Sequence, residues 1–120
     1  MTDQERDATL GICLMAAFSD GARDETERAE IERISRTLPG GGGADLPALY
    51  EDVRLGRRTL ASAAADLGSP QARQLAYELA VCVCNADGSQ SAPEREYLAR
   101  LHSALGLAPE AAAAFSRQAE

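Results

Sequence analysis

The feature that most constrains the fold is a motif that the chain carries twice. Its form is D-G-x-x-[D/S]-x-x-E, and it begins at Asp20 and again at Asp87, an offset of 67 residues. From each aspartate onward, six of 19 aligned positions are identical. An apolar segment precedes each copy, and an amphipathic segment of helical period follows it. The repeat predicts two pseudo-symmetric helical hairpins, at about 8–38 and 75–105, which share one core.

Helical periodicity also extends through the rest of the chain. Aromatic residues make up only 4%, and alanine, the best helix former, is abundant. Pro39 and four glycines break the pattern at 39–44, which we interpret as a flexible surface loop, since a phosphate-binding loop would need a following lysine and a preceding strand. No segment alternates long enough to predict a strand. We expect an all-α protein of about seven helices, at 5–19, 25–38, 45–56, 57–67, 70–85, 91–105 and from Pro109 onward.

Size and charge narrow the class of function. With 120 residues and an ordinary apolar fraction of 45%, the chain is expected to form one domain, 1–120. Its net charge of −7 disfavours binding to nucleic acids and to anionic membrane surfaces. The longest uncharged segments are too short to cross a bilayer, and no signal peptide is visible. The sequence therefore predicts a cytoplasmic protein that does not insert into the membrane.

The thiol and imidazole side chains do not indicate a catalytic or zinc site. Cys13, Cys82 and Cys84 lie in apolar, helix-like segments, which predicts buried thiols in a reducing compartment. Cys82 and Cys84 are two residues apart, so on a helix they point to different sides and do not share a metal. His102, the only histidine, borders the apolar stripe of its helix, where we expect a packing role. We assign no catalytic residue and expect a protein that is not an enzyme.

Helix capping accounts for most of the repeated motif. Its glycine can adopt the left-handed conformation that ends a helix. Asp24 and Ser91 then serve as N-caps, and Glu27 and Glu94, three residues later, complete capping boxes. Capping does not explain the aspartate before each glycine, because a carboxylate at a helix C-terminus faces the negative end of the helix dipole.

A second interpretation adds a bound cation to the caps. Calcium prefers oxygen ligands from a tight loop, but neither copy is an EF-hand, since Val83 and Ala16 would occupy the first ligand position and cannot ligate. Two interpretations of the motif therefore remain open, capping alone and capping together with a cation site that is not an EF-hand. The candidate ions are calcium, magnesium and zinc. The candidate ligands are the acidic and hydroxyl residues of the two motifs: Asp20, Asp24, Glu27, Asp87, Ser91 and Glu94.

Two segments of the chain resemble the TerB-like family, which includes the tellurite-resistance protein TerB and related bacterial domains. They read "FSDGARDETERAEIERI" and "NADGSQSAPEREYLARL". Each holds the end of an apolar helix, an Asp-Gly pair, and a helix that opens with x-x-E. The likeness covers about 8–110. It departs from the usual form where Phe18 and Ser19 precede Asp-Gly in place of alanine, and in the glycine loop.

The resemblance implies an all-α fold of about seven helices with internal pseudo-symmetry. It also implies a role in tellurite and other chemical stress, in complexes near the cytoplasmic membrane, and metal binding by the acidic motif residues. No catalytic activity is firmly attached to the family. We therefore expect a non-enzymatic stress-response domain that acts through a protein partner, with a divalent cation at the two turns as an additional element. The alternative is a metal-dependent hydrolase that uses the same carboxylates.

Overall fold

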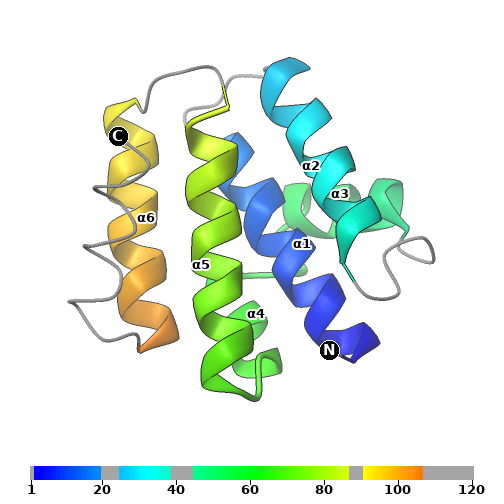
Figure 1. The fold of residues 1–120 in the computed structure, drawn as a ribbon, viewed down its shortest axis with the longest axis vertical. Coiled ribbons are helices and arrows are strands. Elements are labelled where there is room, and N and C mark those ends of the chain that lie inside the picture. The colour runs from blue at the N-terminus through cyan, green and yellow to red at the C-terminus, as the bar shows by residue number, and fades with distance from the viewer. Residues whose placement is uncertain (1, 20–24, 39–44, 87–90, 107–120) are drawn as a thin grey trace.

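The structure is a computed structural model that describes residues 2–19, 25–38, 45–86 and 91–106, with the backbone alone for 25–27. Every regular element in these ranges is an α-helix (Figure 1). The helices are α1 (Asp3–Phe18), α2 (Glu25–Thr37), α3 (Leu46–Arg54), α4 (Leu60–Asp66), α5 (Pro70–Cys84) and α6 (Ala92–Leu105). The predicted all-α class is confirmed. The helix expected from Pro109 onward lies outside the described residues, as do the glycine loop and most of both motif turns.

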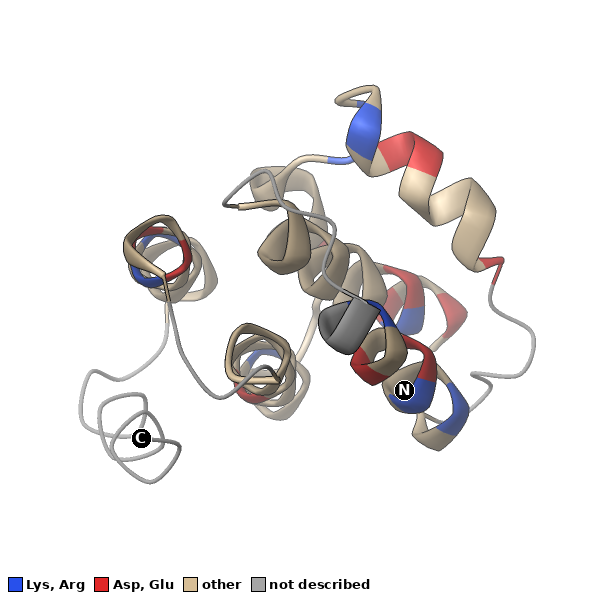
Figure 2. Ribbon diagram, turned by 90° about the horizontal axis from the view of Figure 1, so that it is seen from above, with Lys and Arg blue, Asp and Glu red and all other residues tan. Residues whose placement is uncertain are grey.

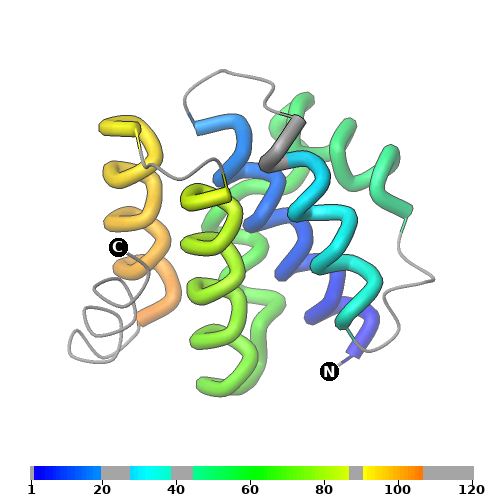
Figure 3. The backbone as a smooth tube through the Cα atoms, turned by 45° about the horizontal axis from the view of Figure 1, so that its top comes forward, coloured from blue at the N-terminus to red at the C-terminus, as the bar shows by residue number. Residues whose placement is uncertain are grey.

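Helix α1 lies at the centre of the fold and contacts each of the other five described helices. In Figure 3, α2 and α5 cover one side of α1, and α3 and α4 lie behind it. An apolar helix surrounded in this way is buried around most of its circumference, as its sequence indicates. Its fully buried side chains include Leu10, Ile12 and Cys13.

Helix α6 follows the predicted stripe, since Leu98, Leu101 and Leu105 are all buried. The hydroxyl of Tyr97, on the same helix, donates a buried hydrogen bond of 2.9 Å to the carbonyl of Ile12 in α1. Since a buried phenol needs a partner, this bond fixes α6 against the central helix.

Side-chain caps define where several helices begin. Thr2 and Glu5 form a capping box at α1, and Thr59 forms one with Ser62 at α4. The second box explains a wrong boundary, because α4 begins at Leu60 and not near Arg57 as predicted. Gly56, with φ of 75°, turns the chain after α3, and the polypeptide stays non-helical up to the Thr59 cap.

The three cysteines lie on α1 and α5, and all are thiols, not disulfides. Cys13 and Cys84 are buried as expected, whereas Cys82 is only half-buried. Burial raises the pKa of the Cys13 thiol to about 12, so this thiol stays protonated at neutral pH. These properties are those of packing residues, not of activated nucleophiles.

Acidic and basic residues both occur along α2 and α3, as the red and blue ribbon segments of Figure 2 show. On α2, Arg33 pairs with Glu30 and Arg36 with Glu32, while on α3 Arg54 lies 2.6 Å from a Glu51 oxygen. Exposed pairs of this kind contribute little to stability. They do make these faces polar and well solvated.

Candidate functional site

The turn between α5 and α6 carries the second copy of the repeated motif. Helix α5 ends at Cys84, with Asn85 as its C-cap, and α6 begins at Ala92, with Ser91 as its N-cap. Pro93 lies in the first turn of α6, where its missing N–H leaves no helical hydrogen bond unmade. Residues 87–90, including Asp87, lie outside the described part of the chain.

The capping box predicted at this turn is present. The Ser91 hydroxyl accepts a hydrogen bond of 3.2 Å from the Glu94 backbone N–H. In return, Oε1 of Glu94 accepts a bond of 2.8 Å from the Ser91 N–H. The backbone N–H groups of Ser91 and Glu94 lie at the start of α6, where the helix has no carbonyl to accept their hydrogen bonds.

Glu94 does more than a capping residue at a helix surface. Its side chain is only 2% exposed, and its second oxygen, Oε2, is buried without a hydrogen-bond partner. An ionised carboxylate buried in this way is costly unless a donor or a cation compensates it. The amide nitrogen Nδ2 of Asn85, across the same turn, is also buried without a partner. The turn therefore holds polar atoms whose partners the described protein groups do not supply.

The position of Glu94 in the sequence already indicates that its side chain is buried. Glu94 lies four residues before Leu98 and so falls on the apolar stripe that continues through Leu101. A carboxylate in register with a core stripe is expected to be buried. Glu27 has the same relation to Ile31, although its side chain lies outside the described residues.

The other predicted ligands are only partly placed. Asp20, Asp24 and Asp87 fall outside the described ranges, and Glu27 is described only as part of the α2 backbone. Among the side chains that the structure does describe, no three Cys, His, Asp or Glu residues gather as metal ligands. Val83 is fully buried in α5, which agrees with the exclusion of an EF-hand.

Comparison with known families decides the relationship. The family model of tellurite resistance protein TerB matches residues 6–117. The chain belongs to the TerB family. No curated protein and no solved structure gives a significant match. Both motif copies of this TerB domain fall inside the matched range, so the resemblance seen in the sequence is confirmed.

His102 is the only histidine of this TerB domain. His102 borders the stripe of α6 as predicted, and its ring meets that of Tyr77 edge-on at 6.0 Å. Its Nε2 atom is buried without a hydrogen-bond partner. This packing against an aromatic ring fits the expected structural role.

Arg73 is a residue that sequence reasoning missed. Its Nε donates to the carbonyl of Leu67, and its Nη1 donates to that of Leu105, at 3.0 and 3.1 Å. It thereby satisfies carbonyls at the ends of two helices, α4 and α6. Among the helices that the structure describes in this TerB domain, none has the length and apolar character needed to cross a bilayer.

Proposed function

We propose that this TerB-family domain is a non-catalytic, cytoplasmic component of a tellurite-type stress response. In this proposal it acts by binding a protein partner within a membrane-associated complex, and it holds a divalent cation at the α5–α6 turn. Family membership supports the stress role. The observation that carries the cation is the buried, unpartnered Oε2 of Glu94.

The two oxygens of Glu94 have different tasks in this proposal. Oε1 completes the cap, for which a glutamine would serve equally well. Oε2 faces no described donor, so a glutamate there is favoured only if something positive reaches it. A cation at the turn would compensate the buried negative charge at Oε2, whereas the capping hydrogen bond reaches only Oε1.

The chemistry of the donors favours calcium or magnesium over zinc. Glu94 and Ser91 offer carboxylate and hydroxyl oxygens, and the Asp87 carboxylate follows the same turn in sequence. Oxygen donors suit hard cations, whereas zinc prefers sulfur and nitrogen. The equivalent residues of the first motif, Asp20 and Glu27, would provide a second site of the same kind.

The alternative, a metal-dependent hydrolase, has less support. Such an enzyme needs a substrate cleft beside its metal. Glu94 is almost fully buried in the first turn of α6, which follows the C-terminal end of α5. The large pocket that the structure shows lies around the N-terminal half of α5. A cation at the turn is therefore better suited to hold two helices together than to activate water.

A metal titration of the full chain, followed by amide NMR, tests the cation. Calcium or magnesium is expected to shift the amides of 85–94 and of 20–27 more than any others. Glu94→Gln keeps the cap and removes the charge, so the metal-free protein should stay folded while the apparent Kd rises at least about tenfold. Glu96→Gln, exposed on the same helix, is the matched control and should bind like the wild type.

Two results would contradict the cation site. One is the absence of a shift at either turn with millimolar calcium, magnesium or zinc. The other is a Glu94→Gln variant that binds as tightly as the wild type. In either case capping alone would account for the repeated motif, and the partner-binding role would remain to be tested by co-purification from cells under tellurite stress.

A further inference from the structure

Buried polar atoms without a hydrogen-bond partner gather where α5 leads into α6. In the part of the chain that the structure describes, four side-chain atoms are of this kind, and two of them are Oε2 of Glu94 and Nδ2 of Asn85. Helices α5 and α6 lie side by side, with the end of α5 and the start of α6 at the same end of the pair (Figures 1 and 3). The two atoms therefore belong to one end of one helical hairpin.

Asn85 is held at this turn by its backbone, while its side chain keeps a choice of atom. It is the C-cap of α5, and its N–H donates a hydrogen bond of 3.0 Å to the carbonyl of Val81. An amide group has a nitrogen that donates and an oxygen that accepts. A half turn about the Cβ–Cγ bond exchanges the two atoms with little change of shape, so Asn85 can offer either one to the turn.

We infer that Asn85 is a ligand of the cation proposed above, through its Oδ1, and that the α5–α6 turn binds this cation more tightly than the first motif copy does. The inference rests on the proposed function, since it takes the cation to lie beside Glu94. Nδ2 of Asn85 has no acceptor where it lies, so turning the amide breaks no hydrogen bond of that atom. Amide oxygens and carboxylates are both ordinary ligands of calcium.

The first motif copy has no equivalent of this amide. At the offset of 67 residues, Phe18 at the end of α1 corresponds to Asn85. Its ring meets that of Tyr50 edge-on, with the centroids 5.0 Å apart, and a phenyl ring has no oxygen to offer a hard cation. The hydroxyl of Ser19, next in the chain, donates a hydrogen bond of 2.7 Å back to the carbonyl of Ala16. The two copies therefore offer different sets of ligands, which predicts different affinities.

A calcium titration of the full chain, followed by NMR, measures the order of binding. We expect the side-chain NH2 signals of Asn85 to shift together with the amides of 91–94. These signals should saturate at a calcium concentration at least about tenfold below that needed for the amides of 25–27. Saturation of both turns at one concentration would overturn the order. An Asn85 side chain that does not respond while the amides of 91–94 do would overturn its role as a ligand.

Two substitutions separate the oxygen of Asn85 from its nitrogen. Asn85→Ala should raise the apparent Kd at the α5–α6 turn at least about tenfold, whereas Asn85→Asp keeps an oxygen and should bind at least as tightly as the wild type. Without metal, Asn85→Asp should have a lower Tm than the wild type, because a second carboxylate then lies at the turn that buries Glu94. Calcium should raise that Tm by more than it raises the Tm of the wild type.

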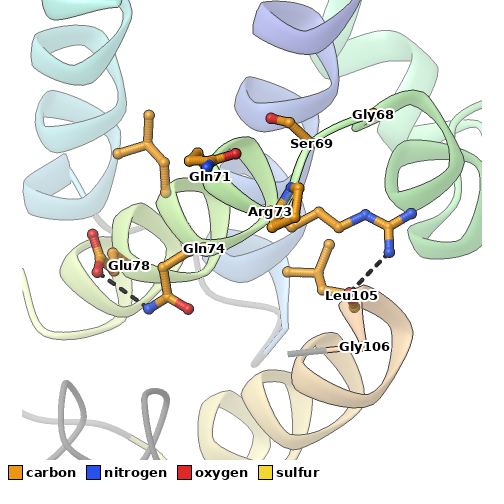
Figure 4. A pocket seen from close by; sticks show the side chains of 10 residues that line it. Gly68, Ser69, Gln71, Arg73, Gln74, Glu78, Leu105 and Gly106 are labelled. Atoms are coloured by element: carbon orange, nitrogen blue, oxygen red, sulfur yellow. Dashed lines mark hydrogen bonds between the residues drawn. The ribbon is translucent and has the colours of Figure 1, made fainter. Parts of the chain in front are cut away.

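Gln71→Ala is the control for these variants. Gln71 is an exposed amide at the opposite end of α5, where it lines the pocket of Figure 4, and its loss should leave calcium binding unchanged.

The failure of this inference and the failure of the proposed function give different results. Asn85→Ala binding calcium as tightly as the wild type would refute the inference and leave the cation at Glu94 in place. Equal losses of affinity in Asn85→Ala and Asn85→Asp would also refute it, because the turn would then require the amide nitrogen. A chain that binds no cation at either turn would refute the proposed function together with the inference.

Discussion

At the scale of single residues, Gly11 shows how one missing side chain lets the segment between α3 and α4 pack closely against α1. Gly11 is buried in α1, and a Cβ added to it would lie 2.5 Å from Cδ of Arg58. The arginine stem thus crosses α1 at this glycine. Its guanidinium group lies 3.6 Å from Asp66, and Asp66 in turn accepts a hydrogen bond from Gln4.

Gly11→Ala should change the free energy of unfolding through two opposite effects. Alanine is favoured over glycine in a helix by about 1 kcal/mol, but the added methyl must displace the Arg58 stem, and such overpacking costs about 1–3 kcal/mol. We expect a net loss of about 1 kcal/mol in the wild-type background and a gain of about 0.5–1 kcal/mol when Arg58 is already alanine. Urea denaturation of the double-mutant cycle measures the difference. Equal effects of Gly11→Ala in the two backgrounds would show that the Arg58 stem does not limit the size of the side chain at position 11.

At the scale of helices, Arg73 joins two ends that are far apart in sequence. We expect Arg73→Ala to lower the free energy of unfolding by about 2 kcal/mol, because the hydrogen bonds of a charged donor to the Leu67 and Leu105 carbonyls are lost. Arg73→Lys should recover less than half of this, since one ammonium group cannot reproduce the two-point geometry of a guanidinium. Arg100→Ala, at an exposed position of α6, is the control. A lysine variant as stable as the wild type would argue against the two-carbonyl bridge.

The helices themselves could be predicted from sequence because their signals are local. Periodic apolar residues, Ser69-Pro70 and the Ser91–Glu94 box all act within a few positions, and each is found where expected. The start of α4 was predicted wrongly because the capping box of its N-cap, Thr59, is completed by Ser62, at a position where a glutamate or glutamine is usual.

The candidate site could be predicted only in part. Ser91 and Glu94 were found as caps, but the unpartnered Oε2 depends on how α6 packs, which a motif does not contain. Arg73 could not be recognised at all. Its partners are backbone carbonyls, which every residue has, so the sequence does not mark the acceptors. One of the two acceptors is 32 positions away.

At the scale of the whole molecule, the buried Cys13 thiol and Tyr97 phenol make the folded state less stable at alkaline pH. Burial raises the pKa of Cys13 from 9.0 to about 12, and it also raises that of Tyr97. Above pH 9 the unfolded chain loses the thiol proton while the folded chain keeps it, so stability must fall as pH rises. For Cys13 alone the loss is on the order of 1 kcal/mol at pH 10.

Urea denaturation between pH 8 and pH 10 measures this dependence. We expect the Cys13→Ala variant to lose less stability over this range than the wild type, because it has no thiol to titrate at that position. Slopes that coincide would place the alkaline sensitivity on other groups, such as the half-buried Cys82, whose pKa burial also raises.

The central position of α1 has a consequence for synthesis in the cell. Of the described helices, α1 leaves the ribosome before the others. The two helices that enclose it most extensively, α5 and α4, end only at Cys84 and Asp66. At about 5–20 residues per second, an apolar helix waits roughly 3–13 s for α5 to be completed. During that interval the nascent chain exposes apolar surface that the folded domain buries, and surface of this kind favours aggregation and chaperone binding.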